Sequence, residues 1–523
     1  MSDRAPRSVL HTALLAAQLL HVHVLGSTLA DRLLVDAATA DTHAEGKIIF
    51  VAPDGDDHAG SGAAPSSPLA SCAAATRIIQ EICDADKLPR GGIEVRFAAG
   101  RYRLSSATAC GTLTCKATAE TPIVLRAAGD GEVVFDGTRQ LGKKMHPVTN
   151  ATVRSLLNPA AINDVQWLSV DAASGWTGIG QVLQWGDRPL TPSVWPNTGL
   201  GYIEKIWDSG AIYCPGRTKG PVPVCQICTG DERSSQVKPC GANFSLTEAP
   251  SGDWERELLA GPGFGGAQVT LDGYIGADWF HEAHTIVRVV RADDSNRTTS
   301  VQLGESSHYG VCEAVEGKGP GCSGGDDGGA PGRFRVHGLL SNVDQQGEYF
   351  FDRAARLLYL VPPKEKGELG FWAGPGLISI VNSSHITVRD IAVSGSASLT
   401  GALEVIGGDS NTVGGCTVRS CATGIALRGG HRNAARGNDV FDMTGFHITT
   451  SSNENETLEN SRSDLVPTNN VVSNNQFTQV YLATTGWSVH AGGVGDRFSH
   501  NLIHDAPGQV ILAGGPLTMW DHK

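Results

Sequence analysis

The sequence predicts an all-β protein built on a right-handed parallel β-helix, a solenoid of short stacked strands, with an inserted β domain. Three observations support this fold class. The 523-residue chain is 40% hydrophobic and 18% charged, so it can bury a full core. It contains 65 Gly and only 4 Met, with few long amphipathic stretches, which favours many short strands joined by turns. Finally, a repeat of about two dozen residues runs through the C-terminal third.

Short apolar triplets recur from residue 378 onward. The sequence can be written as six aligned segments so that these triplets fall beneath one another. The second residue of each segment then lies at position 388, 413, 435, 472, 498 or 519, which gives steps of 25, 22, 37, 26 and 21 residues. A period this short cannot contain a strand, a helix and another strand, but it fits one coil of a β-solenoid. Two apolar columns are expected to point inward. They are Val388, Val413, Ala435, Val472, Phe498 and Met519, and Val393, Val418, Val440, Phe477 and Ile503.

Asparagine repeats at one position of three coils, at Asn438, Asn475 and Asn501. Stacked amides can hydrogen-bond along the solenoid axis and tolerate a tight turn, so this column is expected to be structural. The 37-residue step contains a stretch rich in Ser, Asn and Glu, residues 451–463, which is expected to be a loop leaving one coil. We assign residues 378–523 to β-helix coils. The last line ends inside a coil, so we expect the β-helix to be truncated at this C-terminus.

Residues 48–139 are expected to form the N-terminal cap and the first coils of the same solenoid. The pattern predicts a helix over residues 73–82. It also predicts short strands at 48–51, 93–97, 123–126 and 133–135.

Residues 140–370 lose the periodicity and concentrate Trp, Gly, Pro and cysteines, which indicates an inserted β-rich, Cys-containing domain. Two apolar runs, residues 348–352 and 357–361, are separated by four residues. We expect them to form a hairpin that leads back to the β-helix.

Residues 1–30 are interpreted as a secretory signal peptide, because Arg4 and Arg7 precede an apolar run that closes on small residues. Cleavage is expected after Ala30. Histidine and glutamine interrupt the run, so a leader without processing is the alternative. No other segment of the sequence is apolar enough to span a bilayer, and we expect a secreted or cell-surface protein.

Twelve cysteines, an even number, agree with an oxidising compartment. Proximity in sequence favours three local disulfides, which would pair Cys72 with Cys83, Cys110 with Cys115, and Cys312 with Cys322.

Four further cysteines form either two disulfides or, because two of them have the spacing of a metal knuckle, a zinc site. They are Cys214, Cys225, Cys228 and Cys240. We favour disulfides and predict no metal and no other cofactor. Five sequons would suit N-glycosylation in a eukaryotic source. They lie at Asn150, Asn243, Asn296, Asn382 and Asn455.

The formal charge of −13 is spread without a basic block, so an electrostatic footprint for nucleic acid or an anionic membrane is missing. We exclude nucleic acid as a partner. The expected partner is a polysaccharide or oligosaccharide, bound by a monomer.

Several motifs resemble those of exported right-handed parallel β-helix proteins of the pectate-lyase-like superfamily, close to glycoside hydrolase family 141. The resemblance covers most of the chain from residue 48 and implies the fold, export and action on a complex polysaccharide. Relatives of this fold also include lyases, epimerases and proteins without known activity, so the resemblance indicates chemistry less sharply than fold. The motifs are residues 50–57, 92–102, 195–197, 347–353 and 500–507.

Glycoside hydrolysis needs two carboxyl groups that flank the scissile bond. Two residues after the second apolar column, Asp442, Gln479 and Asp505 occupy one position of successive coils. Neighbouring strands lie about 4.8 Å apart, so two coils separate the aspartates by roughly 9.5 Å, at the upper end of the inverting range. Asp442 and Asp505 are therefore the predicted catalytic carboxylates. The alternative is that both only cap solvent-facing turns.

His504, the neighbour of Asp505, is predicted to assist catalysis. The other predicted site residues bind the sugar, the polar ones through its hydroxyl groups and tryptophan by stacking. They are Gln479, His447, His490 and Trp487. His500 and Trp520 are open to the same interpretation, and each of these residues has a structural alternative as a core or edge residue.

A polysaccharide lyase or epimerase is the main rival to a hydrolase. It would need a Lys or Arg base and often Ca²⁺. Arginines are available at positions 389, 419, 428, 432 and 436, but no acidic cluster of calcium-loop type appears. A non-catalytic surface protein that binds glycans along the β-helix is the second rival.

Overall fold

The computed structural model describes most of the chain from residue 46 to residue 513. The described ranges are 46–142, 144–178, 181–210, 241–247, 254–259, 269–277, 280–291, 299–307, 310–314, 332–451, 468–480, 489–505 and 511–513. The proposed signal peptide, the four-cysteine cluster, most of the 451–463 loop and the sixth repeat line lie outside these residues. No described helix is both long enough and apolar enough to cross a membrane.

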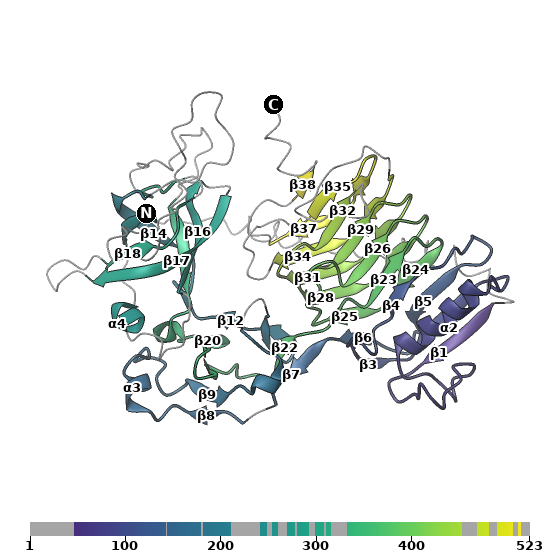
Figure 1. The fold of residues 1–523 in the computed structure, drawn as a ribbon, viewed down its shortest axis with the longest axis horizontal. Coiled ribbons are helices and arrows are strands. Elements are labelled where there is room, and N and C mark those ends of the chain that lie inside the picture. Colours follow the sequence, from purple (N-terminus) through teal and green to yellow (C-terminus); the bar gives the residue numbers. More distant parts are fainter. Residues whose placement is uncertain are drawn as a thin grey trace, which may run out of the picture. The chain divides into compact units, whose positions relative to one another are not determined.

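The chain divides into two compact units. The first comprises residues 1–138, 373–481 and 487–517, and the second is mainly residues 139–372. The first unit is a parallel β-helix of three sheets, coloured from purple to yellow along the sequence in Figure 1.

Each of the three sheets takes one strand from each successive coil. The first sheet contains β1 (Lys47–Val51), β2 (Ile93–Phe97), β5 (Ile123–Ala127), β24 (Ile386–Arg389), β27 (Thr412–Gly414), β30 (Ala434–Arg436), β33 (Val471–Ser473) and β36 (Arg497–Ser499). The second contains β3 (Gly100–Arg103), β6 (Val133–Asp136), β25 (Ala392–Ser394), β28 (Thr417–Cys421), β31 (Asp439–Met443), β34 (Gln476–Val480) and β37 (Leu502–His504). The third contains β4 (Gly111–Leu113), β23 (Ile378–Val381), β26 (Leu403–Ile406), β29 (Ile425–Arg428), β32 (Ile448–Ser451), β35 (Val489–Gly492) and β38 (Ile511–Ala513).

The coil before the second unit stacks directly on the coil after it. Ile123 pairs in parallel with Ile386, and Val134 pairs with Ala392, although the second unit lies between them in sequence. The β-helix is therefore one continuous stack interrupted by an insertion. The predicted fold class, a parallel β-helix with an inserted β domain, is confirmed.

The core of the β-helix consists of the inward-facing columns. Val388 and Val413 are 1% exposed, and Ala435, Val472 and Phe477 are completely buried. The third sheet adds an inward column that the two-column repeat did not predict. Its members are Ile380, Val405 and Leu427, and a second inward column of the same sheet contains Leu403, Ile425, Ile448 and Val489.

The predicted asparagine column is confirmed, and each of its residues stands directly before a strand of the second sheet. The Asn438 amide donates to Oδ1 of Asn475 at 2.9 Å, and the Asn475 amide donates to Oδ1 of Asn501 at 2.9 Å. These bonds run parallel to the solenoid axis, so they bind successive coils to one another inside the protein.

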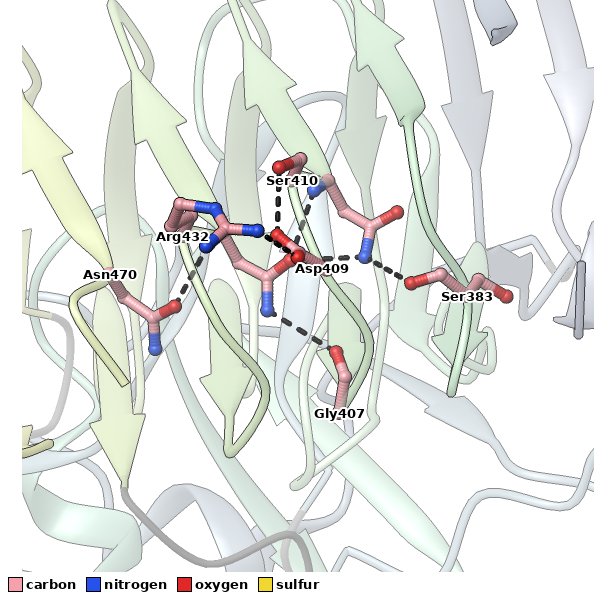
Figure 2. Close-up of polar contacts among 8 residues, drawn as sticks. Ser383, Gly407, Asp409, Ser410, Arg432 and Asn470 are labelled. Atoms are coloured by element: carbon pink, nitrogen blue, oxygen red, sulfur yellow. Dashed lines mark hydrogen bonds and ion pairs between the residues drawn. The ribbon is translucent and has the colours of Figure 1, made fainter. Parts of the chain in front are cut away.

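A second asparagine column, which was not predicted, stands directly before the strands of the first sheet. Asn411 donates to Oδ1 of Asn433 at 3.0 Å, and Oδ1 of Asn470 accepts from the backbone of Asn433 at 3.0 Å. Figure 2 shows this corner, where Arg432 also pairs with Asp409 near the surface.

The predicted helix is present as α2 (Cys72–Asp84), but the predicted pairing of its cysteines is wrong. Cys72 bonds Cys110, and Cys83 bonds Cys115. Cys72 and Cys83 stand near opposite ends of a helix that rises about 1.5 Å per residue, roughly 16 Å apart, and a disulfide spans at most about 7 Å between Cα atoms. The two disulfides instead tie the helix to the first coil.

Three other cysteines are described. Cys312 is also disulfide-bonded, and its partner lies outside the described residues, as does Cys322. Cys416 and Cys421 carry free thiols inside the β-helix core, where burial raises the pKa of each thiol to about 12.

The second unit contains three sheets and short helical segments. The four-stranded sheet contains β7 (Thr138–Gln140), β10 (Leu183–Trp185), β11 (Arg188–Pro189) and β22 (Leu369–Trp372). The five-stranded sheet contains β8 (His146–Pro147), β9 (Gln166–Ser169), β12 (Thr191–Pro192), β20 (Glu348–Asp352) and β21 (Leu357–Leu360). The helical segments are α3 (Ala151–Arg154), η1 (Ala172–Ser174), α4 (Trp254–Leu259) and η3 (Leu340–Asn342). β20 and β21 pair antiparallel, which confirms the predicted hairpin.

The third sheet of the second unit closes into a barrel. β16, the last strand of the order, pairs with β17 and also with β19, the second strand, and this closes the sheet. The barrel interior is apolar and includes Ile203, Leu271 and Phe334, all fully buried. Its strands are β13 (Val194–Trp195), β14 (Gly201–Asp208), β15 (Asn243–Leu246), β16 (Thr270–Ala277), β17 (Phe280–Arg291), β18 (Thr299–Leu303) and β19 (Arg333–His337).

Candidate functional site

The two predicted catalytic aspartates occupy equivalent positions of the second sheet, two coils apart. Phe441 of β31 pairs with Thr478 of β34, and Thr478 pairs with His504 of β37. Asp442 directly follows Phe441, and Asp505 directly follows His504. Neighbouring strands are about 4.8 Å apart, so the backbones of the two aspartates lie roughly 9.5 Å apart along the stack.

Both aspartates stand at a corner where the backbone turns out of the strand. Asp442 has a φ of 56° and Asp505 a φ of 54°, and Ser420 has 51° at the same position of the preceding coil. This left-handed conformation is one that Asp and Asn adopt more readily than most residues. Corner geometry alone therefore accounts for an aspartate at these positions, and any catalytic role must rest on their surroundings.

Asp442 lies in a half-buried environment next to a positive charge. Burial raises the pKa of Asp442 above its ordinary value, and the nearby Arg419 guanidinium opposes this rise. Arg419 pairs in register with Phe441 and so belongs to the preceding coil. A carboxyl group with a raised pKa keeps its proton to higher pH, which is the property a general acid needs.

Asp505 has a different environment. Its side chain is 70% exposed, and its Oδ2 lies 2.7 Å from Nδ1 of His504. The other nitrogen of His504 lies 3.1 Å from the Gln476 side-chain amide, and Thr478 Oγ1 lies 3.4 Å from Nδ1. The imidazole is therefore fixed by contacts on both sides and can orient the Asp505 carboxylate.

The structure does not bring His447 and His490 to this site. His447 is completely buried, where its Nε2 donates to the carbonyl oxygen of Thr478 at 2.9 Å. A buried ring presents no surface to a sugar, so its predicted role in substrate binding is wrong and its role is structural. His490 belongs to β35 of the third sheet, where its ring lies 5.8 Å from that of Phe446.

Two predicted residues cannot be located fully. Trp487 and the side chain of Gln479 lie outside the described part of the structure, as does Trp520. The backbone of Gln479 belongs to β34, between Asp442 and Asp505 in the column.

Sequence reasoning named Arg419 and His504 but missed that they belong to one outward-facing row of the second sheet, together with Phe441 and Thr478. Asp439 belongs to the adjacent outward row, between Thr417 of the preceding coil and Gln476 of the next. Phe441 is partly exposed and lies between Asp442 and the inward-facing Val440. Strand alternation could have found this row, because the residues beside an inward column must point outward.

Among the described residues, no group of three or more His, Cys, Asp or Glu side chains is arranged to hold a metal ion.

A sequence model of the right handed beta helix region matches residues 372–518. The chain is a right-handed parallel β-helix protein. This β-helix protein is similar in fold to a solved glycoside hydrolase, with a TM-score of 0.58, 16% sequence identity, and alignment over 90% of this chain and 79% of that chain. The expected resemblance is confirmed at the level of the fold.

Two further solved structures match this β-helix protein over much of its length but with low similarity. One is XylC in complex with xylose, with a TM-score of 0.35, 9% identity, and coverage of 88% of this chain and 62% of that chain. The other is the Pseudomonas phage phi297 tailspike gp61, with a TM-score of 0.13, 9% identity, and coverage of 79% and 44%. No curated protein sequence matches the chain.

Proposed function

We propose that this protein hydrolyses glycosidic bonds of a complex polysaccharide with two carboxylates, Asp442 and Asp505, and inverts the anomeric centre. The observation that carries the proposal is the shared column of these two aspartates in two different environments. The carboxyl groups of inverting enzymes lie about 6.5–9.5 Å apart, with room for a water molecule, and a backbone separation of roughly 9.5 Å is compatible with that spacing.

The different surroundings of the two aspartates support a different catalytic role for each. Asp442, with its raised pKa, is the general acid that protonates the leaving oxygen. Asp505 is the general base, because its exposed carboxylate can accept a proton from the attacking water. His504 is a positioning residue that binds one oxygen of Asp505 and leaves the other for the water.

Sugar binding is assigned to residues around the pair. Phe441 offers a partly exposed aromatic ring on which the apolar side of a pyranose can stack. Gln479 lies between the two aspartates in the column, and Trp487 follows eight residues later. His490 would contact only a ligand that reaches the third sheet.

The cysteines support a proposal for where the protein is located in or outside the cell. Two disulfides of the first coil, Cys72–Cys110 and Cys83–Cys115, favour folding in an oxidising compartment. With the apolar N-terminal run, this supports a secreted or cell-surface protein, which we propose acts as a monomer and carries N-linked glycans if its source is eukaryotic.

The test is reducing-sugar release from a panel of soluble complex polysaccharides. Asp442→Asn and Asp505→Asn should each lower kcat/KM by about 100-fold or more, the usual loss when a general acid or base is removed. Asp390→Asn is the matched control. Asp390 also has a left-handed backbone, φ 59°, but at a corner of the first sheet, so this variant should retain full activity.

Proton NMR of the first product should show inverted anomeric configuration. Full activity of both aspartate variants, or an unsaturated uronide that absorbs in the ultraviolet, would refute the hydrolase. An unsaturated uronide would favour a lyase instead.

A further inference from the structure

The outer face of the barrel in the second unit carries aromatic and basic side chains in register. Tyr202 of β14 pairs with Arg333 of β19, and Arg333 pairs with Tyr274 of β16. Their sequence neighbours Ile203, Phe334 and Ile275 are fully buried in the barrel interior, so these three side chains point outward. Figure 1 shows β14 and β16 among the barrel strands. We call Tyr202, Tyr274, Arg333, Arg335 and Asp272 the barrel face.

Both arginines of the barrel face have hydrogen-bonding capacity to spare. The Arg333 guanidinium carbon lies 5.0 Å from the centre of the Tyr274 ring, and its buried Nε has no hydrogen-bond partner among the described residues. Arg335 is exposed and donates from Nε to the carbonyl oxygen of Gly199 at 3.0 Å. No carboxylate within the described ranges forms an ion pair with either arginine.

The one acid of the barrel face lies between two histidines. Asp272 Oδ2 lies 3.1 Å from Nε2 of His281, and its Oδ1 lies 2.6 Å from Nε2 of His337. Burial alone would raise the pKa of Asp272, but hydrogen bonds from the two histidines hold it well below its usual range. Both oxygens of this carboxylate thus lie next to histidine nitrogens, and among the described residues neither forms an ion pair with the arginines.

An exposed aromatic ring beside the arginines adds a second kind of contact. Tyr202 is 41% exposed, so its ring is open to a ligand. An aromatic face suits the apolar side of a sugar ring, and a guanidinium suits a carboxylate. Glu204, the exposed acid on β14, accepts a hydrogen bond from the Ser245 hydroxyl at 3.2 Å.

We propose that the barrel face binds an acidic oligosaccharide, with its carboxylates held by Arg333 and Arg335 and a sugar ring stacked on Tyr202. The positive character of this face stands out in a chain with a formal charge of −13. Such a site belongs to the second unit, whereas the aspartate column belongs to the β-helix, and it does not depend on the hydrolase assignment.

The experiment is calorimetric titration of the full chain with polygalacturonate. Carboxyl-reduced polygalacturonate supplies the same sugar backbone without charge, and polyglutamate supplies carboxylates without sugar rings. The wild-type protein should bind polygalacturonate at least tenfold more tightly than either control polymer. Arg333→Gln and Arg335→Gln should each weaken binding about 10- to 100-fold, the usual effect of losing a charge-assisted hydrogen bond.

Tyr202→Ala should weaken binding about three- to tenfold. Arg288→Gln, a charge change at an exposed position of β17 in the same barrel, is the matched control and should have no effect. Because Arg335 and Tyr202 are exposed, their variants should fold even if Arg333→Gln does not, and thermal melting checks this.

Equal binding of either control polymer, or equal affinities of the Arg335 and Arg288 variants, would overturn the proposal. An unaffected Tyr202→Ala variant would also overturn it, because the face would then be a general polyanion surface. Asp442→Asn should bind polygalacturonate as the wild type does. Failure of sugar release with intact binding would refute the hydrolase alone, and loss of binding with intact release would refute only the barrel site.

Discussion

Replacing Asn475 with alanine should destabilise the β-helix more than any exposed substitution. Asn475 is 2% exposed, and its Oδ1 accepts from the backbone and the side-chain amide of Asn438, both at 2.9 Å. Its amide donates to the carbonyl oxygen of Ala435 at 3.1 Å and to Oδ1 of Asn501 at 2.9 Å. The substitution therefore removes four hydrogen bonds and leaves polar groups of the buried Asn438 and Ala435 without one of their partners.

Each such unsatisfied group costs about 1–3 kcal/mol, and a water molecule that enters the vacated space can satisfy some of them. We expect a loss of about 4 kcal/mol, which is a large part of the 5–15 kcal/mol typical of a folded protein. Asn501→Ala is the matched comparison. Asn501 is only half-buried and makes three side-chain bonds, so its loss should be about 1–2 kcal/mol.

The assay is urea unfolding followed by circular dichroism, with the slope of each transition compared to confirm that the same surface is exposed. The reasoning predicts an order, with Asn475→Ala less stable than Asn501→Ala and both less stable than the wild type. If Asn475→Ala lost no more stability than Asn501→Ala, the asparagine column would not hold the coils together.

Three further predictions concern charge and disulfides. Arg419 lowers the pKa of Asp442, so Arg419→Gln should move the alkaline limb of kcat/KM to higher pH, and an unmoved limb would contradict Asp442 as the acid. Burial raises the pKa of Glu348 from 4.5 to about 7, so the folded protein holds this proton more tightly than the unfolded chain. The free energy of unfolding should therefore fall by about 3 kcal/mol as the pH rises from 4.5 through 7. Thermal melts at a series of pH values should show a weaker pH dependence of stability for Glu348→Gln than for the wild type. An unchanged pH dependence would contradict the assignment to Glu348. Cys83→Ser with Cys115→Ser opens a 32-residue loop and should cost about 4 kcal/mol in non-reducing urea unfolding, whereas a loss below about 1 kcal/mol would show that the disulfide is dispensable.

The coils could be predicted from the sequence because their inward positions repeat. Val388, Val413 and Ala435, for example, occupy the same position in successive coils. Because apolar side chains are buried, this column must point into the β-helix. The third sheet was missed although Leu403–Ile406 and Ile425–Arg428 also repeat. Its strands are separated from the others by turns of variable length, which hides their register from a line-by-line comparison.

The disulfides show where proximity in sequence misleads. Cys72 and Cys83 were paired because they are near each other, yet the helix predicted between them already separates their Cα atoms too far. Combining the two predictions would have excluded that pair. The actual partners, Cys110 and Cys115, come close only after the chain completes a coil, and sequence spacing does not show this return.

The candidate site divides in the same way between what a repeat reveals and what packing decides. The shared column of Asp442 and Asp505 follows from coil length, but their different environments depend on neighbours from other coils, Arg419 for one and His504 for the other. His447 shows the limit, because a histidine near the end of a coil is compatible with either face. Its ring turns inward to the carbonyl of Thr478, so only the three-dimensional packing of two coils removes it from the site. Residues within a strand can thus be assigned to a face by alternation, whereas residues at corners need the structure.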